Sequence, residues 1–384
     1  MMSCFLVLED GTQFPGKPFG VPAPRTDAFP SEEALRAVGE VVFNTGMTGY
    51  HEILTDSSYA GQLVTMTYPH IGNYGVDDLW SETCDSDRGV IPGIKPAGLI
   101  VRSLYRGPVP EGRASLDSFL RKHHTPGISD VDTRALTLRI RDLGSPKGII
   151  VRSEVKEESL SPAEIRQCVD FLASVPNMVG RDLIQDVGTE TVQTVNESGS
   201  PHLVLVDCGI KANIVREMTN LGCRVTVTPS GFTAEEIIAL QPDAVLYSNG
   251  PGDPAALEPT IRQIKTLVGR LPVFGICLGH QLIALALGAS TYKMKFGHHG
   301  ANHPVRDERT GRVFVTSHNH GFAVDERTLP KDVQVWFRNA NDNTLEGFMH
   351  SRLPILAAQF HPESAPGPHD STWIFREFLD RIPR

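Results

Sequence analysis

The second half of the chain alternates short apolar segments with segments of helical periodicity, and this alternation constrains the fold more than any other feature. The expected strand–helix pairs are 202–206 with 213–221, 224–227 with 234–240, 244–248 with 259–269, and 273–276 with 278–287. Such repetition predicts an open, mostly parallel α/β sheet covered by helices. Later strands at 313–317 and 355–360 should join this sheet, and a final amphipathic helix is expected at 372–382. Ligands of such sheets bind beyond the carboxyl ends of the strands.

The first half has a different pattern, in which short segments rich in Val, Ile, Leu and Thr are separated by turn residues. These segments predict strands at 4–8, 39–43, 63–67 and 98–101. Residues 15–30 hold five prolines and are predicted to form a loop. Helices are expected at 31–38 with Ser31 as N-cap, at 116–123 and at 133–143. The first half is therefore predicted to be a β-rich, mixed α/β domain.

A polar stretch separates the two patterns. Residues 186–202 read DVGTETVQTVNESGSPH and contain no aromatic residue and no continuous apolar run. The expected organisation is an N-terminal domain at 1–187, a linker at 188–202 and a C-terminal domain at 203–384. A length of 384 residues fits two or three domains of roughly 150 residues each.

Charge and cysteine usage exclude several classes of protein. The net charge is −9 and there is no long basic run, so neither nucleic acid nor an anionic membrane is expected as a partner. The six cysteines form no CxxC pair, which argues against a zinc cage or a redox dithiol and fits a reducing compartment. The N-terminal residues MMSCFLVLEDG do not resemble a signal peptide. A cytoplasmic location is expected.

The segment most informative about chemistry is PVFGICLGHQLIALALGA, residues 272–289. A buried strand runs into Gly275-Ile276-Cys277-Leu278-Gly279 and then directly into a helix, which is the cysteine form of a nucleophile elbow. Its glycines permit a strained turn that lifts Cys277 above the sheet. The helix N-terminus favours a thiolate there and leaves the Leu278 N–H free to bind an oxyanion. The alternative is an ordinary buried cysteine at a strand end.

A base for this thiol is expected in ILAAQFHPE, residues 355–363. Pro362 favours an extended conformation at His361, and residues two apart in extended chain point the same way. Glu363 could therefore hold the His361 ring in one tautomer. The alternative is a loop histidine beside a solvated glutamate. In SNGPGDP, residues 248–254, Gly250 and Gly252 could present a second N–H to the oxyanion, or simply form a turn.

The second half also contains a group of histidines, which makes a metal site conceivable. They show no tight ligand spacing with carboxylates, and a thiol–base mechanism needs no metal. We therefore expect no metal ligands and interpret these residues as hydrogen-bonded loop histidines. They are His298, His299, His303, His318 and His320.

The motifs GICLGHQ and HPE resemble the signature of the class I glutamine amidotransferases. Five further segments resemble the small, glutamine-hydrolysing subunits of carbamoyl phosphate synthetase, and together they cover nearly the whole chain. The segments in the first half are specific to that family. The five segments are 46–75, 130–144, 295–305, 318–326 and 361–370.

This resemblance implies that Cys277 is the nucleophile, His361 the general base and acid, and Glu363 its orienting group. Backbone amides of Gly252 and Leu278 would form the oxyanion hole. Gln281 lies four residues after Cys277 and so can face the same pocket, whereas Ser58 would reach it from the first domain. The glutamine-binding residues implied by the family are Ser58, Gly250, Gly252, Leu278, Gln281, Asn319, Gly321 and Phe322.

The resemblance also implies a function and a partner. The chain would hydrolyse L-glutamine to glutamate and ammonia through a thioester, and pass the ammonia to a large subunit for arginine and pyrimidine biosynthesis. No Walker loop or Mg²⁺ motif is evident, so ATP and Mg²⁺ are assigned to the large subunit, and no cofactor is expected on this chain. The alternatives are a glutaminase serving a different synthetase, a stand-alone thiol hydrolase, or a non-enzymatic regulatory subunit of the same fold.

The chain departs from the family pattern in a few places. The Pro-rich stretch with its short helix at 21–37 is longer than usual and is interpreted as a surface insertion. Ala301 replaces a usual glycine, His318 replaces a usual glutamine, and HPESA replaces the commoner HPEAS. None of these changes removes a catalytic atom, but His318 could alter the local loop or its response to pH.

Overall fold

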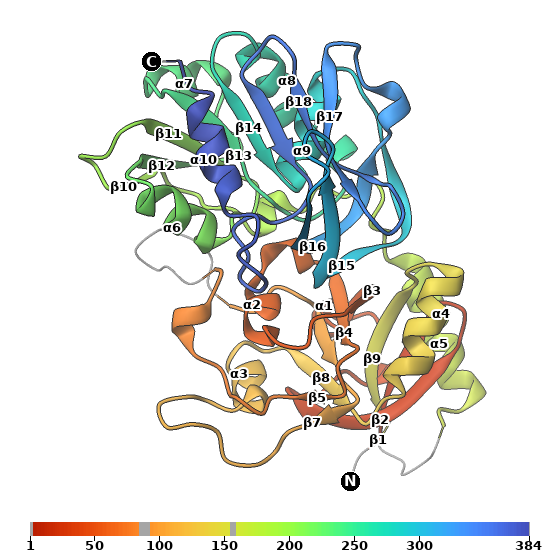
Figure 1. Cartoon of the computed structure of the whole chain (residues 1–384). Helices are drawn as coiled ribbons and strands as arrows, with labels where there is room; N and C mark the ends of the chain where they lie inside the picture. Colours follow the sequence, from red (N-terminus) through yellow and green to blue (C-terminus); the bar gives the residue numbers. More distant parts are fainter. Residues whose placement is uncertain (1–2, 84–92, 154–158, 384) are drawn as a thin grey trace. The chain divides into compact units, whose positions relative to one another are not determined.

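A computed structural model describes residues 3–83, 93–153 and 159–383. The described residues fall into two compact units, one with residues 3–81 and 93–179 and one with residues 82–83 and 180–383. Both units combine helices with sheets that include parallel strands, which confirms the predicted α/β class (Figure 1). No described helix is long and apolar enough to cross a membrane.

The first unit is built around a closed barrel whose strands follow the order β1-β2-β8-β6-β4-β3-β9. Neighbouring pairs among β3, β4, β6 and β8 are parallel, and the other pairs are antiparallel. The strands are β1 (Ser3–Leu8), β2 (Gln13–Gly20), β3 (Val38–Asn44), β4 (Gln62–Met66), β6 (Gly98–Ile100), β8 (Pro126–Ser129) and β9 (Lys147–Ser153); β5 (His70–Ile71) and β7 (Ser103–Leu104) form a separate pair. The helices are α1 (Glu32–Arg36), α2 (Tyr50–Thr55), α3 (Leu116–Lys122), α4 (Thr133–Leu143) and α5 (Pro162–Ser174).

The strands and helices predicted in the first unit are present, but β8, β9, α2 and α5 were not predicted, and two predictions differ in their bounds. Ser31 caps α1 as expected, because its Oγ accepts from the Ala34 N–H at 3.2 Å, but the helix ends before Val38, where β3 begins. The predicted loop 15–30 is wrong for residues 15–20, which belong to β2. Each half of β2 pairs on one side only, with β1 and then with β8, so a proline facing the open side removes no ladder hydrogen bond.

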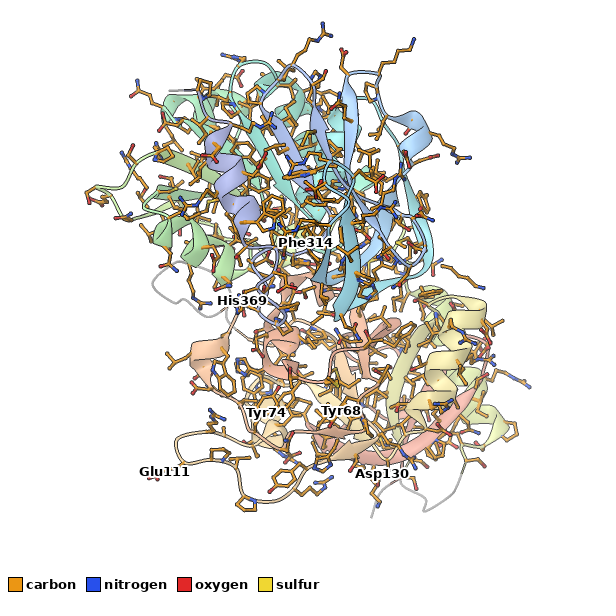
Figure 2. All side chains as sticks on the ribbon, viewed as in Figure 1. Tyr68, Tyr74, Glu111, Asp130, Phe314 and His369 are labelled. Atoms are coloured by element: carbon orange, nitrogen blue, oxygen red, sulfur yellow. The ribbon has the colours of Figure 1, made fainter. Side chains whose placement is uncertain are left out.

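Aromatic side chains fill part of the first unit's core. Tyr50 of α2 stacks on Tyr74, which is labelled in Figure 2, and the ring centroids are 4.2 Å apart. The Tyr50 hydroxyl donates to the Gly75 carbonyl at 2.7 Å. Burial of one large side chain of this kind contributes about 1.5–3 kcal/mol. The core therefore anchors a helix that the sequence pattern did not reveal.

The second unit contains one large sheet with the strand order β10-β12-β11-β13-β14-β19-β18-β17-β15-β16. The five strands from β12 to β19 in this order run parallel, and the remaining pairs are antiparallel. The strands are β10 (Gln193–Val195), β11 (His202–Asp207), β12 (Arg224–Pro229), β13 (Ala244–Tyr247), β14 (Val273–Ile276), β15 (Thr291–Asp307), β16 (Val313–Val324), β17 (Val333–Asn339), β18 (Leu345–His350) and β19 (Ile355–Ala358). The helices are α6 (Ala212–Asn220), α7 (Ala234–Ala239), α8 (Glu258–Leu267), α9 (Leu278–Ala286) and α10 (Trp373–Asp380).

The predicted alternation of strands and helices in the second half is confirmed, and β16 and β19 join the same sheet as expected. The structure adds β15, β17 and β18, which the pattern did not predict. It also places β10 within the segment 188–202 that the sequence assigned to a linker, as an antiparallel edge strand beside β12. The polar, β-branched residues of β10 suit an edge strand, where one side of the backbone faces solvent.

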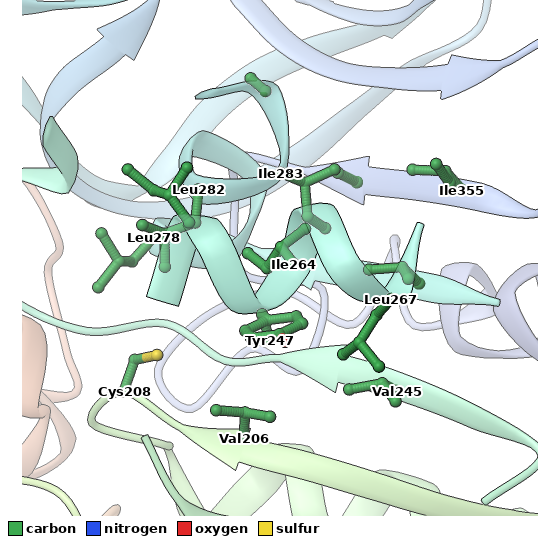
Figure 3. Packing of buried hydrophobic residues seen from close by; sticks show 14 of the residues in the cluster. Val206, Cys208, Val245, Tyr247, Ile264, Leu267, Leu278, Leu282, Ile283 and Ile355 are labelled. Atoms are coloured by element: carbon green, nitrogen blue, oxygen red, sulfur yellow. The ribbon is translucent and has the colours of Figure 1, made fainter. Parts of the chain in front are cut away.

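Two hydrophobic clusters cover the two faces of this sheet. Leu203 and Leu205 pack with residues of α6 and α10, whereas Val204 and Val206 pack with residues of α8 and α9. This division follows from the alternation of side chains along a strand. Figure 3 shows the second cluster, in which Ile264, Leu267, Leu282 and Ile283 cover Val245 and Tyr247. Both faces of the sheet are therefore buried, so a ligand can reach the sheet only at the ends of its strands.

Candidate active site

Three neighbouring strands end at the same edge of the second sheet. β13, β14 and β19 are adjacent and parallel, with Tyr247 opposite Gly275 and Ile276 opposite Ala358. The segments that follow them are 248–254, the turn at Cys277, and the segment with His361 and Glu363. Motifs more than 100 residues apart in sequence therefore meet at one place. This is the edge where open α/β sheets bind ligands.

Cys277 occupies a strained turn between β14 and α9. Its backbone lies at φ 53° and ψ −104°, a conformation that non-glycine residues rarely adopt. Gly279 is required for close packing here, because a Cβ at this position would lie 2.1 Å from the Tyr247 carbonyl oxygen. The turn expected from the G-x-C-x-G pattern is present. Among the described residues, no backbone carbonyl accepts from the Leu278 N–H, which starts the helix beside the thiol.

His361 and Glu363 form a buried pair beside this turn. His361 Nδ1 and Glu363 Oε1 are 2.7 Å apart, and both side chains are almost completely inaccessible. His361 Nε2 is buried, and the Cys277 side chain lies close enough to interact with the ring. Burial opposes a positive ring, but the carboxylate of Glu363 and the neighbouring Cys277 side chain favour it more strongly and raise the pKa of His361. The ring is therefore held by one nitrogen and can exchange a proton through the other.

A buried lysine completes this arrangement, and sequence reasoning missed it. Lys211 Nζ lies 3.0 Å from Glu363 Oε1 and also donates to the Ser364 carbonyl. Burial disfavours the carboxylate of Glu363, whereas Lys211 and then His361 stabilise it, so the pKa of Glu363 is lowered. The available signal was a lysine four residues after the end of strand β11, at the catalytic edge of the sheet.

Several predicted glutamine-binding residues contact the Cys277 turn or one another. The Gln281 N–H donates to the Cys277 carbonyl at 3.3 Å, and Gln281 Nε2 donates to the Phe322 carbonyl at 2.8 Å. The Cys277 thiol lies 3.7 Å from the Asn319 carbonyl oxygen. Strand β16 therefore lies along the thiol and carries Asn319, Gly321 and Phe322.

Gly250 and Gly252 lie in the segment that follows β13. A Cβ at Gly250 would lie 2.0 Å from the Cys208 carbonyl oxygen and 2.9 Å from a methyl carbon of Leu278, so this backbone passes close to the Cys277 turn. Ser58 belongs to the first unit, where it lies in the short 3₁₀ helix Ser57–Tyr59 and its N–H donates to Asp56 Oδ1. Its role in glutamine binding stays a prediction.

The histidines expected in loops lie instead on paired strands, so that expectation is wrong. His298, His299 and His303 lie on β15, and His318 and His320 lie on β16. The two strands pair through His298 opposite His320 and His299 opposite Asn319. His299 Nδ1 and Asn319 Oδ1 are 2.9 Å apart, which connects this group to the strand beside Cys277.

The geometry allows nucleophilic chemistry at a carbonyl carbon. The thiol lies at a helix N-terminus, a buried imidazole is oriented by a carboxylate, and a backbone N–H is available for a developing oxyanion. None of these steps requires a metal ion. Arrangements of this kind support acyl transfer through a thioester.

Comparisons with known proteins cover both halves of the chain. The family "Carbamoyl-phosphate synthase small chain, CPSase domain" matches residues 6–150, and "Glutamine amidotransferase class-I" matches residues 204–381. The "Carbamoyl phosphate synthase small chain" of Archaeoglobus fulgidus is 45% identical over 99% of this chain and 99% of its own length. The protein of the same name from Methanocaldococcus jannaschii is 44% identical over 98% of both chains.

A plant protein and a solved structure are also similar. The "Carbamoyl phosphate synthase small chain, chloroplastic" of Oryza sativa subsp. japonica is 44% identical over 98% of this chain and 81% of its own. The crystal structure of a glutamine amidotransferase from Thermotoga maritima matches 42% of this chain and 76% of its own, with 18% identity and a TM-score of 0.35.

Proposed function

The chain belongs to the carbamoyl phosphate synthase small chain family, and from this premise we propose that it hydrolyses glutamine at Cys277 and supplies the ammonia to a large synthetase subunit. One observation carries the proposal. Cys277 sits in a strained turn beside a buried His361, whose ring interacts with Cys277 and is held through Nδ1 by Glu363. The class-I amidotransferase match covers all three residues.

The first half-reaction forms a thioester. The Cys277 thiolate attacks the side-chain amide carbon of glutamine, and the carbonyl π electrons move to the oxygen. The N–H groups of Leu278 and Gly252 stabilise that oxyanion, an effect typically worth about 3–4 kcal/mol per donor. When the oxyanion collapses, the C–N bond breaks and His361 gives its proton to the leaving nitrogen, which departs as ammonia.

The second half-reaction releases glutamate. His361, now neutral, accepts a proton from water, and the hydroxide formed attacks the thioester carbon. The C–S bond breaks, Cys277 leaves as a thiolate, and His361 again carries the proton. Glu363 and Lys211 stay in place throughout, since their role is to fix the tautomer and the charge of the ring.

The substrate pocket and the partner follow from the family. We assign glutamine binding to Gly250, Gly252, Leu278, Gln281, Asn319, Gly321 and Phe322, and the family resemblance adds Ser58. The large subunit would combine the ammonia with bicarbonate and ATP in the presence of Mg²⁺, to make carbamoyl phosphate for arginine and pyrimidine synthesis. We place this work in the cytoplasm, as a heterodimer of small and large chains.

The test uses the chain together with the large subunit that copurifies with it. Cys277→Ser should abolish carbamoyl phosphate synthesis from glutamine and leave synthesis from added ammonia intact, because only the glutaminase loses its nucleophile. Cys168→Ser is the matched control, since this buried cysteine lies in α5 of the first unit. Glutaminase activity in Cys277→Ser would refute the mechanism.

The identity of the copurified chain tests the partner. Recovery of a large ATP-dependent chain that makes carbamoyl phosphate supports the proposal. Recovery of a different synthetase would keep the thiol chemistry and overturn the pathway. A purified complex that never uses glutamine, although the wild-type triad is present, would favour the regulatory alternative.

A further inference from the structure

A second group of polar side chains is buried in the same unit as the catalytic triad. His298 of β15, His318 and His320 of β16, and Glu346 of β18 are each at most 5% exposed. One donor atom from each lies within 4.8 Å of the others. These four residues are called here the histidine–glutamate cluster. The triad mechanism does not use it, and its composition is rare in a protein interior unless something balances it.

In each histidine of the cluster, the ring nitrogen that points away from the centre of the cluster contacts a specific oxygen atom. His320 Nδ1 lies 2.9 Å from the Phe322 carbonyl oxygen, and since a carbonyl can only accept, this nitrogen carries a proton. His318 Nε2 lies 2.8 Å from Thr316 Oγ1, whose hydroxyl proton is already donated to the His303 carbonyl. His318 Nε2 must therefore donate as well. The remaining nitrogens, His318 Nδ1 and His320 Nε2, then present lone pairs.

These two lone pairs face each other across 3.3 Å. Glu346 Oε2 lies 3.7 Å from His318 Nδ1 and 3.8 Å from His320 Nε2, and within the described residues it accepts no hydrogen bond. Three electron-rich atoms thus converge in a buried space with no donor between them. Such an arrangement is unfavourable unless a cation occupies the centre.

His298 supplies the fourth donor. Its Nε2 lies 2.9 Å from Asp342 Oδ2, and its Nδ1 lies 3.1 Å from Glu346 Oε1. A carboxylate that accepts from the outer nitrogen of a histidine is the usual partner of a metal-binding imidazole, because it fixes the ring and raises its basicity. Binding of an ion would displace the Nδ1 proton of His298 to solvent.

The separations between donor atoms are close to those around a small tetrahedral ion, and several are longer. Bonds of about 2.0–2.1 Å to a tetrahedral zinc ion separate neighbouring donor atoms by about 3.3–3.4 Å. Four separations in the cluster are 3.1 Å to Glu346 Oε1, 3.7 and 3.8 Å to Glu346 Oε2, and 3.3 Å between His318 Nδ1 and His320 Nε2. All the donor atoms lie within 4.8 Å of one another. Three imidazoles and one carboxylate favour Zn²⁺ or a similar transition ion over Mg²⁺ or Ca²⁺, which prefer oxygen ligands.

From this geometry we propose that His298, His318, His320 and Glu346 bind one divalent transition-metal ion of the zinc class, in a closed site that braces strands β15, β16 and β18. All four ligands come from the protein and are buried, which is typical of structural rather than catalytic zinc. Sequence spacing did not predict the site, because its ligands are brought together by strand pairing.

The site would stabilise the strand that lines the proposed glutamine pocket, a consequence that rests on the proposed function. The Phe322 carbonyl that accepts from His320 Nδ1 also accepts from Gln281 Nε2. Asn319, whose carbonyl faces the Cys277 thiol, lies between His318 and His320. His318 and His320 are proposed ligands, so the ion would hold β16 at the two residues that flank this contact with the thiol.

The test measures metal directly and does not depend on glutaminase activity. The full chain, purified with its large subunit, is equilibrated with Zn²⁺ or Co²⁺ alone, and bound metal is determined by elemental analysis. We expect one ion per small chain and the intense visible absorption of tetrahedral Co²⁺. His318→Gln, which restores the residue usual at this position in the family, should lose both signals. Asp342→Asn should weaken Zn²⁺ binding by about 10- to 100-fold, because it removes only the partner of a ligand.

His303→Gln is the matched control, since its ring lies 4.8 Å from that of His318 and yet it is not one of the four ligands. It should retain metal. Circular dichroism of each variant, with unchanged secondary structure expected for His318→Gln, separates lost ligation from failed folding. Substoichiometric metal in the wild-type protein would overturn the proposal and assign the cluster to protonated, hydrogen-bonded histidines. Undiminished metal in His318→Gln would also overturn it.

Discussion

The catalytic triad and the histidine–glutamate cluster both lie beside strand β16, and both bury histidine with glutamate. They differ in how charge is ordered. Around the triad, Lys211, Glu363 and His361 alternate in sign and each is within 3.0 Å of the next. In the cluster, three acceptor atoms converge without a donor among the described residues. A line of alternating charges keeps a proton available for chemistry, whereas converging acceptors create a place for an ion.

The sharpest way to break this comparison is to remove the charge that orients His361. Glu363→Gln should lower kcat for glutamine hydrolysis by about 10²–10⁴-fold, because the ring loses its fixed tautomer and the partner of its positive form. The measurement is steady-state release of glutamate. Ammonia-dependent synthesis by the complex serves as the control and should not change. Unaltered glutaminase activity would show that Glu363 does not orient the base.

Removing the buried cation should damage the fold as well as the activity. Lys211→Met leaves the carboxylate of Glu363 buried without its lysine, and loss of one partner of a buried pair costs about 3–5 kcal/mol. Urea unfolding measures this change in the free energy of unfolding. The double variant Lys211→Met/Glu363→Gln should recover much of the stability without recovering activity. Wild-type stability in the single variant would contradict the pairing.

Metal should stabilise the second unit through the cluster and not through the triad. Zn²⁺ at 100 times its dissociation constant should raise the free energy of unfolding by about 2.7 kcal/mol. Cys277→Ser should show the same gain, since its thiol is not a proposed ligand, and Glu346→Gln should show none. Thermal unfolding with Zn²⁺ and with a chelator provides the measurement. A gain that requires Cys277 would place the ion at the catalytic thiol and not in the cluster.

The smallest effect expected is a dependence of stability on pH. The pKa of His361 is raised above its ordinary value of 6.5, mainly by Glu363 against the opposing effect of burial. Its contribution to stability is therefore fully present below pH 6.5 and decreases as the pH rises toward the raised pKa of the folded state. One such group changes the free energy of unfolding by at most about 1.4 kcal/mol per pH unit. Urea titrations between neutral and alkaline pH should show this slope, and Glu363→Gln should flatten it.

The sequence predicts those parts of the molecule whose signals are local. The strand–helix pairs from 202 to 287 follow from hydrophobic periodicity, and the turn at Cys277 follows from two glycines around a cysteine. The contact between His361 and Glu363 follows from their spacing after a strand. Each of these features is encoded within about ten residues, so tertiary structure had little opportunity to override it.

The features that were missed depend on pairings between distant segments. Strand β15 is rich in histidine and polar residues and contains Gly297 and Pro304, so its sequence gives no alternating pattern. Its length and register appear only when it pairs with β16, across two irregularities. The residues around Lys211 in the sequence resemble those of an ordinary surface lysine. Lys211 is buried because it contacts Glu363 and Ser364, which lie about 150 residues later in the chain.

The position of β19 has a consequence for the order in which the protein becomes competent. This strand enters between β14 and β18, in the middle of the sheet, although it is the last strand in the described chain. During synthesis, Cys277 is added to the chain 84 residues before His361, the residue that activates its thiol. Until β19 is inserted, the growing protein would hold a gap in its central sheet and an incomplete pocket. Formation of the last strand would therefore act as the step that turns a folded intermediate into an enzyme.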